Sequence, residues 1–301
     1  ATAAGKNSTA IGSSASAEAR DSYAVGTGSS ATAERSFSVG SDATAAGKNS
    51  TAIGSSASAE GSKSLAIGTD SRSSDLNSVA IGTESSATAA NSVAIGQSGI
   101  ASNPNSYAIG TNAVASGEDA SSIGRQSTAT STNSIAFGTK SRASNNRAIA
   151  IGTKAKSSGE ASIAIGTDSR ATSEYSVSIG KQSSATGARS TAIGYGAEAH
   201  RDDEMSLGTQ ASRYRLRGLS PGSGFVNGKY QNSGEKRIVT TDSSGTLGTT
   251  NFSVDKLLDT VGATGAMSAA LGSLPTNVLL PNETVRCGIG TGVYSSQFAG
   301  A

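Results

Sequence analysis

The side chains that most often carry catalysis or bind metals are scarce in this sequence. There is one histidine, His200, and one cysteine, Cys287, among 301 residues. Serines are abundant, but only His200 is present to serve a serine nucleophile as its general base, and no histidine-rich metal site can form within one chain. We interpret His200 as a surface residue and Cys287 as a small strand residue; interchain pairing of Cys287 is the alternative. The sequence therefore predicts no enzyme.

Two further motifs have simpler structural explanations. The segment Gly288-Ile289-Gly290-Thr291-Gly292 matches part of a dinucleotide-binding pattern, but it does not open a helix with an acidic residue about 20 positions on. The acidic run Asp202-Asp203-Glu204 would attract a cation, and we interpret it as an exposed turn. The sequence therefore predicts no cofactor and no metal site.

One group of basic residues has the spacing of a binding surface. Its members recur at intervals of fourteen residues in two series, Lys140 and Lys154 in one, and Arg142, Lys156 and Arg170 in the other. If a fourteen-residue unit stacks on itself, these side chains form ladders with steps of about 4.8 Å. Like charges so close repel unless Asp168, Glu160 or a ligand offsets them. The group is either a solvated face that limits aggregation or an attachment patch for acidic glycans or matrix proteins.

The elements that must position these side chains follow from a strict internal repeat. An apolar residue followed by glycine returns every fourteen residues, fifteen times, from Ile11-Gly12 to Leu207-Gly208. Such a repeat is typical of a solenoid, in which each copy is one rung stacked on the last. The pairs that we expect to be structurally essential are Ile53-Gly54, Ile67-Gly68, Ile81-Gly82, Ile95-Gly96, Ile109-Gly110, Ile151-Gly152 and Ile165-Gly166.

Alternation within each copy predicts two short strands. With the repeat glycine as position 0, position −1 is nearly always Ile or Val, and positions −2 and −4 are almost always Ala or Ser. This pattern indicates a five-residue strand that is bulky on one face and small on the other, and we expect both faces to be buried. Positions +3 and +5 are small while +2 and +4 are polar, so the second strand has small residues inside and polar ones outside. The glycine at position 0 suits a tight corner.

A coil this thin buries little apolar surface by itself. The chain is 35% hydrophobic, 4% aromatic and contains no tryptophan. Methyl-sized side chains gain little at about 25 cal/mol per Å² against a backbone entropy cost of about 1–2 kcal/mol per residue. We therefore expect a closed cyclic oligomer with the first strands facing a shared axis, although the pattern leaves open whether the Ile face or the Ala face points there. The net charge of +2 predicts no nucleic-acid partner.

The segment Asn91-Ser92-Val93-Ala94-Ile95-Gly96, with its fourteen-residue return, resembles the head repeat of the trimeric autotransporter adhesins, the YadA-like family. The resemblance covers residues 1–208. It implies an all-β fold, a left-handed parallel β-roll of 14-residue coils, and a homotrimer wound about one axis. It also implies a non-enzymatic adhesin on the cell surface, at the extracellular face of the outer membrane, which attaches bacteria to matrix proteins, glycans or cell-surface receptors.

The rest of the chain is similar to the segments that follow such heads. Residues 209–250 are predicted to be a neck and connector, because Leu216, Leu219 and Gly222 stand at the neck's apolar and glycine positions and 236–240 is strand-like; Tyr214 replaces the expected neck arginine. Residues 251–301 are predicted to form a short helix over 253–274 and one glycine-rich strand over 285–293. This arrangement resembles the start of an outer-membrane anchor, which would be incomplete here.

Two alternatives to a bacterial adhesin remain open from the sequence. The first is a phage or phage-like tail fibre built on the same β-roll, which would recognise a host; the incomplete anchor and the lack of a signal peptide favour it. The second is an ice-binding solenoid, suggested by recurrent threonines at position +1. Gln97, Arg125, Lys181 and Tyr195 interrupt that threonine series.

Overall fold

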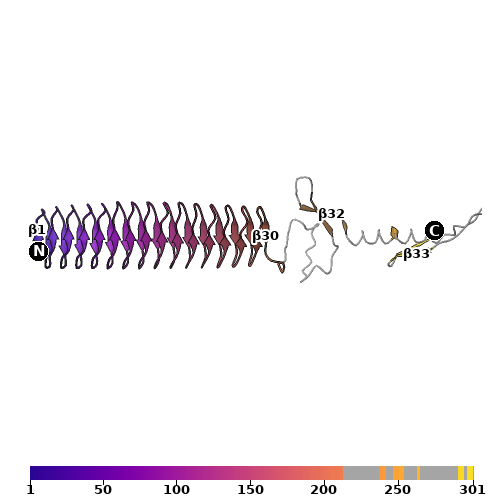
Figure 1. Ribbon diagram of the computed structural model, residues 1–301, viewed down its shortest axis with the longest axis horizontal. Coiled ribbons are helices and arrows are strands. Elements are labelled where there is room, and N and C mark those ends of the chain that lie inside the picture. The colour runs from indigo at the N-terminus through magenta and orange to yellow at the C-terminus, as the bar shows by residue number, and fades with distance from the viewer. Residues whose placement is uncertain (213–236, 242–246, 254–262, 265–290, 295–296, 301) are drawn as a thin grey trace, which may run out of the picture. The chain divides into compact units, whose positions relative to one another are not determined.

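A computed structural model describes residues 1–212, 237–241, 247–253, 263–264, 291–294 and 297–300. The chain divides into two compact units, Ala1–Ser212 and Arg213–Ala301. The first unit is a regular solenoid in which the chain winds through one coil after another (Figure 1). Each coil contributes one strand to each of two parallel sheets of 15 strands, which confirms the predicted parallel β-roll of stacked fourteen-residue rungs.

The sheet formed by positions +4 and +5 is called the polar sheet, and its strands are two residues long. They are β1 (Thr2–Ala3), β3 (Ser16–Ala17), β5 (Ser30–Ala31), β7 (Thr44–Ala45), β9 (Ser58–Ala59), β11 (Arg72–Ser73), β13 (Ser86–Ala87), β15 (Ile100–Ala101), β17 (Val114–Ala115), β19 (Thr128–Ala129), β21 (Arg142–Ala143), β23 (Lys156–Ser157), β25 (Arg170–Ala171), β27 (Ser184–Ala185) and β29 (Glu198–Ala199).

The sheet formed by positions −3 to −1 is called the apolar sheet, and its strands are three residues long. They are β2 (Thr9–Ile11), β4 (Tyr23–Val25), β6 (Phe37–Val39), β8 (Thr51–Ile53), β10 (Leu65–Ile67), β12 (Val79–Ile81), β14 (Val93–Ile95), β16 (Tyr107–Ile109), β18 (Ser121–Ile123), β20 (Ile135–Phe137), β22 (Ile149–Ile151), β24 (Ile163–Ile165), β26 (Val177–Ile179), β28 (Thr191–Ile193) and β30 (Met205–Leu207). The predicted five-residue strand is therefore too long, because the corner that precedes it extends to position −4.

Residues fourteen apart lie side by side in both sheets. In the apolar sheet Val93 pairs with Tyr107, and Ile95 pairs with Ile109. In the polar sheet Thr128 pairs with Arg142. A residue type that recurs every fourteen positions therefore forms a straight column along the roll.

The repeat glycines allow one rung to lie directly on the next. Gly152 has φ of +131°, a region that side chains with a Cβ rarely adopt. A Cβ built on Gly152 would lie 2.5 Å from the carbonyl oxygen of Gly166 in the following rung. The backbone N–H of Gly152 meanwhile donates a hydrogen bond to the carbonyl of Phe137, at 2.7 Å. Glycine at position 0 thus serves both the turn and the close approach between rungs.

Two other corners of each rung have left-handed backbone at residues other than glycine. They occur at positions +2 and +9, where φ is between about +50° and +60°. Asparagine, which tolerates this conformation, is frequent at +9. Three of these asparagines form a chain of side-chain hydrogen bonds, from Asn77 to Asn91 at 3.1 Å and from Asn91 to Asn105 at 3.2 Å. The corner is therefore linked from rung to rung by side chains as well as by backbone.

The interior of the roll is filled by alanine and serine. Ala94 at position −2 and Ala115 at position +5 are completely buried, as are their equivalents in most rungs. Buried serines at −4 and +3 donate to carbonyls of their own corners: Ser92 Oγ to Ala89 O at 2.6 Å and Ser127 Oγ to Gly124 O at 2.8 Å. Small residues therefore fill the space between the sheets while these hydroxyls satisfy corner carbonyls.

The face of the apolar sheet that carries positions −3 and −1 points away from the interior. Tyr107 is 43% exposed and Phe137 is 52% exposed, although the alanines between such residues are fully buried. The expectation that both faces are buried is therefore wrong for one chain, because the interior accommodates only the small residues. Within one chain the Ala face lines the coil, and the Ile face is outside.

The second unit contains two antiparallel strand pairs. β31 (Arg237–Thr241), in the predicted strand-like segment, pairs with β32 (Leu247–Ser253), and β33 (Thr291–Tyr294) pairs with β34 (Gln297–Gly300). Where it is described, the single strand predicted over 285–293 is thus one strand of an antiparallel pair. Of the predicted helix over 253–274, Ser253 is instead the last residue of β32, and residues 263–264 are helical. The neck residues 213–222 and Cys287 lie outside the described residues. Among the residues that the structure describes, no helix is long and apolar enough to span a membrane.

Candidate functional site

The structure places the predicted basic residues on three successive rungs. Arg142, Lys156 and Arg170 are the first residues of β21, β23 and β25, and the register pairs Arg142 with Lys156 and Lys156 with Arg170. All three side chains are exposed. Lys140 and Lys154 precede the first two of these residues by two positions and are exposed as well. These five residues are called the basic ladder.

Local folding explains why the arginines and lysines of β21, β23 and β25 face solvent. Each strand has two residues, and the second one, such as Ala143 or Ala171, is completely buried. Because adjacent strand residues point to opposite faces, the first residue must point outward. Backbone bonds hold the ladder in place, with Arg142 N donating to Ala155 O at 2.9 Å and Arg170 N donating to Ser183 O at 2.9 Å.

Lys140 and Lys154 occupy the left-handed corner that precedes the ladder strands. Each has φ of +58°, a conformation that costs a residue other than glycine about 1–2 kcal/mol. Their backbone N–H groups donate to Arg125 O and Thr139 O, both at 2.9 Å, so the corner is fixed from the rung before. The two lysines therefore stand on a defined backbone beside the Arg142–Lys156–Arg170 column.

The basic ladder lacks internal counter-charges. Within the part of the chain that the structure describes, none of its five side chains forms an ion pair or a side-chain hydrogen bond. Asp168 and Glu160, the expected counter-charges, form no ion pair with it either. The rungs on either side place the neutral residues Thr128 and Ser184 in the same column. The result is a short, exposed run of like charge.

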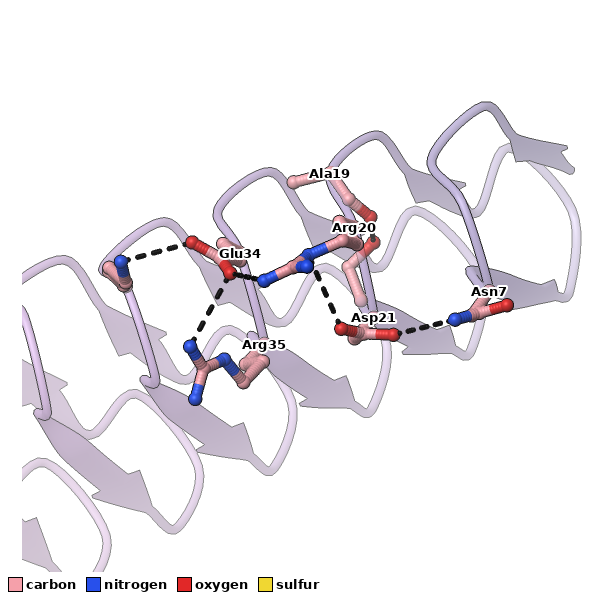
Figure 2. Close-up of polar contacts among 8 residues, drawn as sticks. Asn7, Ala19, Arg20, Asp21, Glu34 and Arg35 are labelled. Atoms are coloured by element: carbon pink, nitrogen blue, oxygen red, sulfur yellow. Dashed lines mark hydrogen bonds and ion pairs between the residues drawn. The ribbon is translucent and has the colours of Figure 1, made fainter.

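A second charged group near the first rungs, which the sequence reasoning missed, has the opposite character (Figure 2). Glu34 lies at its centre and accepts from Arg20, from Arg35 at 3.4 Å and from Lys48 at 3.0 Å. Arg20 also contacts Asp21, at 3.5 Å, and Asn7 Nδ2 donates to Asp21 Oδ1 at 3.0 Å. The signal that reveals it is opposite charge at a spacing of fourteen. We call this group the paired cluster; it consists of Asn7, Arg20, Asp21, Glu34, Arg35 and Lys48.

The paired cluster changes the protonation of its central carboxylate. The hydrogen bond from Arg20, followed by that from Lys48, lowers the pKa of Glu34 to about 2. The same contact raises the pKa of Arg20. Its three cations and two carboxylates contact one another, so most of the charge of the cluster is paired within the chain.

The acidic turn predicted at 202–204 is engaged in internal contacts. Asp203 pairs with Arg189 at 2.7 Å, which lowers the pKa of that carboxyl, and Asp202 accepts from Ala188 N at 2.8 Å. Glu204 accepts from two backbone N–H groups, those of His200 and Arg201, at 2.8 Å each, and these bonds lower its pKa. No group of three or more metal-binding side chains is present among the described residues.

His200 also has a local explanation. Its Nδ1 lies 2.9 Å from Thr186 Oγ1, and its Nε2 lies 3.3 Å from Glu198 Oε2. Both partners come from the outside of the roll, where the histidine is exposed. The basic ladder therefore remains the candidate site of the roll.

Comparison with known proteins gives one family. The model of the YadA head domain repeat, built from two copies, matches residues 3–22, 17–43, 45–71, 76–98, 101–127, 115–141, 143–169 and 171–197. Among solved structures, the collagen-binding domain of the Yersinia adhesin YadA matches with 20% sequence identity and a TM-score of 0.23, over 73% of this chain and 90% of that one. No curated protein matches.

Proposed function

The chain belongs to the family of YadA head domain repeats, and from this premise we propose that it attaches bacteria to host matrix, cells or other surfaces. It is a non-enzymatic, YadA-like adhesin head built as a β-roll. The observation that carries the proposed attachment is the basic ladder, an exposed run of positive charge with no ion pair among the described residues. Its partner on the surface is a matrix protein, glycan or cell-surface receptor that presents acidic groups.

We propose that three copies of the chain assemble through their apolar sheets. The outward column of this sheet exposes large apolar side chains in successive rungs, including Tyr23, Phe37, Ile135 and Phe137. Burying apolar surface of this kind stabilises an assembly by about 25 cal/mol per Å². Closure about a threefold axis hides the column in every copy and leaves the polar sheet, with the basic ladder, facing solvent.

The remaining segments have roles in display. We propose that residues 1–208 form the head, residues 209–250 the neck and connector, and residues 251–301 the beginning of an anchor-like region. The head would then lie at the cell surface, on the extracellular side of the outer membrane. Support comes from the similarity of residues 213–222 to a neck and of the glycine-rich 288–292 to the start of an anchor.

The proposed attachment is tested with a variant, called ladder-neutral, whose basic ladder carries no charge. Lys140, Arg142, Lys154, Lys156 and Arg170 are replaced together by glutamine, and beads coated with the full chain are applied to matrix-coated and cell-covered surfaces. We expect bead retention to fall several-fold and to lose its sensitivity to salt. The matched control replaces five other exposed basic residues of the roll and should retain adhesion; these are Lys6, Lys63, Arg125, Arg147 and Lys181.

Equal retention of the ladder-neutral and control beads would refute the role of the ladder. Absence of adhesion by the wild-type chain on every surface would refute the adhesin function itself. The assembly is tested separately by sedimentation equilibrium of the full chain, for which we expect three times the monomer mass. A soluble, folded monomer at micromolar concentration would contradict the trimer.

A further inference from the structure

We propose that the basic ladder binds a linear acidic polysaccharide that lies along the axis of the roll, with one acidic sugar at each rung. This inference rests on the proposed adhesive function and specifies the chemistry of the partner. Its basis is the arrangement of the charges, which follow one another from rung to rung along the roll. Arg142, Lys156 and Arg170 form a single column across three adjacent strands.

The spacing of the column suits a polymer with one acidic group per sugar. Adjacent strands in a sheet lie about 4.8 Å apart, so the column from Arg142 to Arg170 spans about 10 Å. An extended pyranose unit advances a polysaccharide chain by a length close to one such step. Because neighbouring sugars are rotated about the polymer axis, the long, flexible side chains of Arg142, Lys156 and Arg170 must reach around it to meet successive carboxylates or sulfates.

An extended acidic peptide fits the ladder less well. A strand advances about 3.3 Å per residue and its side chains alternate, so acidic groups on one face recur about every 6.7 Å. Over the three rungs of the column the two spacings drift apart by several ångströms. A peptide therefore engages fewer of the three cations at once than a polyuronate of the same charge.

The lysines at the corner make the surface two columns wide at its first two rungs. Lys140 and Lys154 lie at position +2 beside Arg142 and Lys156, whereas Asp168 takes the equivalent place beside Arg170. A polymer bound along the column therefore meets extra positive charge at one end and a carboxylate at the other. This asymmetry favours one direction of the sugar chain.

The ladder also has defined ends. Thr128 precedes Arg142 and Ser184 follows Arg170 in the same column, and neither carries a charge. Only three rungs of the column can pair with acidic sugars. Affinity must therefore stop rising once the polymer covers those rungs.

A length series provides the test. Oligogalacturonates, which carry one carboxylate per sugar, are titrated against the full chain by calorimetry at low and at physiological ionic strength. We expect affinity to rise with each sugar up to about three and then to level off, with a marked loss on adding salt. Oligoglutamates of equal charge are expected to bind several-fold more weakly than the matching oligogalacturonate.

Two variants and one control sharpen the length series. Ser184→Lys extends the column by one rung and should move the plateau to about four sugars, while raising affinity for longer chains roughly threefold. The triple variant Arg142→Gln, Lys156→Gln, Arg170→Gln should lose roughly thirty-fold. The control, Lys6→Gln, Lys63→Gln, Arg201→Gln, carries the same change in net charge at exposed positions away from the ladder and should keep the wild-type length dependence.

The outcomes separate this inference from the adhesive function. If affinity kept rising with the length of the oligogalacturonate, or if Ser184→Lys did not move the plateau, the pairing of one acidic sugar with each rung would be overturned. Tighter binding of oligoglutamate than of oligogalacturonate would assign the ladder to an acidic protein, again overturning the inference. In both cases, adhesion of beads that depends on the basic ladder would still support the proposed function. If the control variant lost bead adhesion as fully as the triple variant does, both the polysaccharide inference and the role of the ladder in adhesion would be refuted.

Discussion

The paired cluster and the basic ladder are built on the same scaffold and differ in the order of their charges. In the paired cluster, Arg20, Glu34 and Lys48 stand fourteen residues apart and alternate in sign. In the basic ladder, Arg142, Lys156 and Arg170 stand fourteen residues apart and share one sign. The roll supplies the spacing in both regions, and the residue types decide what the spacing does.

This difference separates stabilisation from recognition. Where signs alternate, each charge finds its partner in the next rung and the contacts hold neighbouring coils together. Where the sign repeats, neighbouring charges repel across the same distance. Binding of an acidic ligand is then favourable, because it neutralises this repulsion. A solenoid can thus give different positions of its repeat opposite tasks without any change of backbone.

The largest loss of stability is expected when the backbone of the rungs that carry the basic ladder is disturbed. Gly152→Val forces a β-branched residue into φ of +131° and places its Cβ 2.5 Å from the carbonyl oxygen of Gly166. We expect a loss of at least about 3 kcal/mol in the stability of the neighbouring rungs. Thermal unfolding followed by circular dichroism and limited proteolysis near residue 152 measure it.

Gly28→Ser is the matched control for Gly152→Val. Gly28 also has positive φ, +68°, but it stands at position +2, where other rungs have Ser14 and Ser56 in the same conformation. Its unfolding midpoint should stay close to that of the wild type. Equal midpoints for Gly152→Val and the wild type would show that the rungs can separate without cost.

A smaller effect is expected when the basic ladder is given the charge order of the paired cluster. Lys156→Glu places an acid between Arg142 and Arg170, so repulsion becomes attraction and the thermal midpoint should rise slightly. Binding of an acidic oligosaccharide should fall more than tenfold, because the central cation is replaced by an anion. Lys156→Gln is the control, with a smaller rise in midpoint and roughly a threefold loss of binding. A lower midpoint for Lys156→Glu would contradict the comparison.

The smallest effect concerns the pH dependence of the paired cluster. The pKa of Glu34 is lowered to about 2 from an ordinary value of 4.5, so its ionised form is favoured in the folded chain. The stability that it adds is fully present above pH 4.5 and is lost as the pH falls towards 2. The midpoint of Glu34→Gln should therefore lie below that of the wild type at pH 7, and the gap should close by pH 2.

Glu118→Gln provides the matched control for the pH series. Glu118 occupies the same position of its rung as Glu34, is exposed, and forms no ion pair within the described residues. Its midpoint should follow that of the wild type throughout. If the thermal midpoint of Glu34→Gln still lay below that of the wild type at pH 2, packing rather than charge would connect these rungs.

Much of the roll could be predicted from the sequence, because a fourteen-residue period determines both the number of rungs and which residues are neighbours. The column of Arg142, Lys156 and Arg170 followed directly from that register. The direction of the Ile face did not, because alternation distinguishes two faces without saying which is inside. It is the volume between the sheets, filled by residues such as Ala94 and Ser92, that excludes the larger side chains.

Electrostatic pairing was harder to foresee than register. Asp168 and Glu160 were named as residues that could offset the basic ladder, but within the described residues they form no ion pair with it. The pairing of Glu34 with Arg20 and Lys48 was overlooked, although its members are spaced at the period of the repeat. The register places residues fourteen apart in neighbouring rungs, but it does not decide which of their side chains pair, because Asp168 stands one period from Lys154 and the two form no ion pair in the described part of the chain.

The uniform offset of fourteen residues in both sheets has a consequence for how such a chain can change over generations. Removing or duplicating a whole coil leaves each remaining strand with a complementary neighbour, whereas any other insertion shifts one sheet against its continuation. The length of the roll can therefore change only by whole coils. The number of repeats thus sets how many rungs separate any two side-chain groups on the roll.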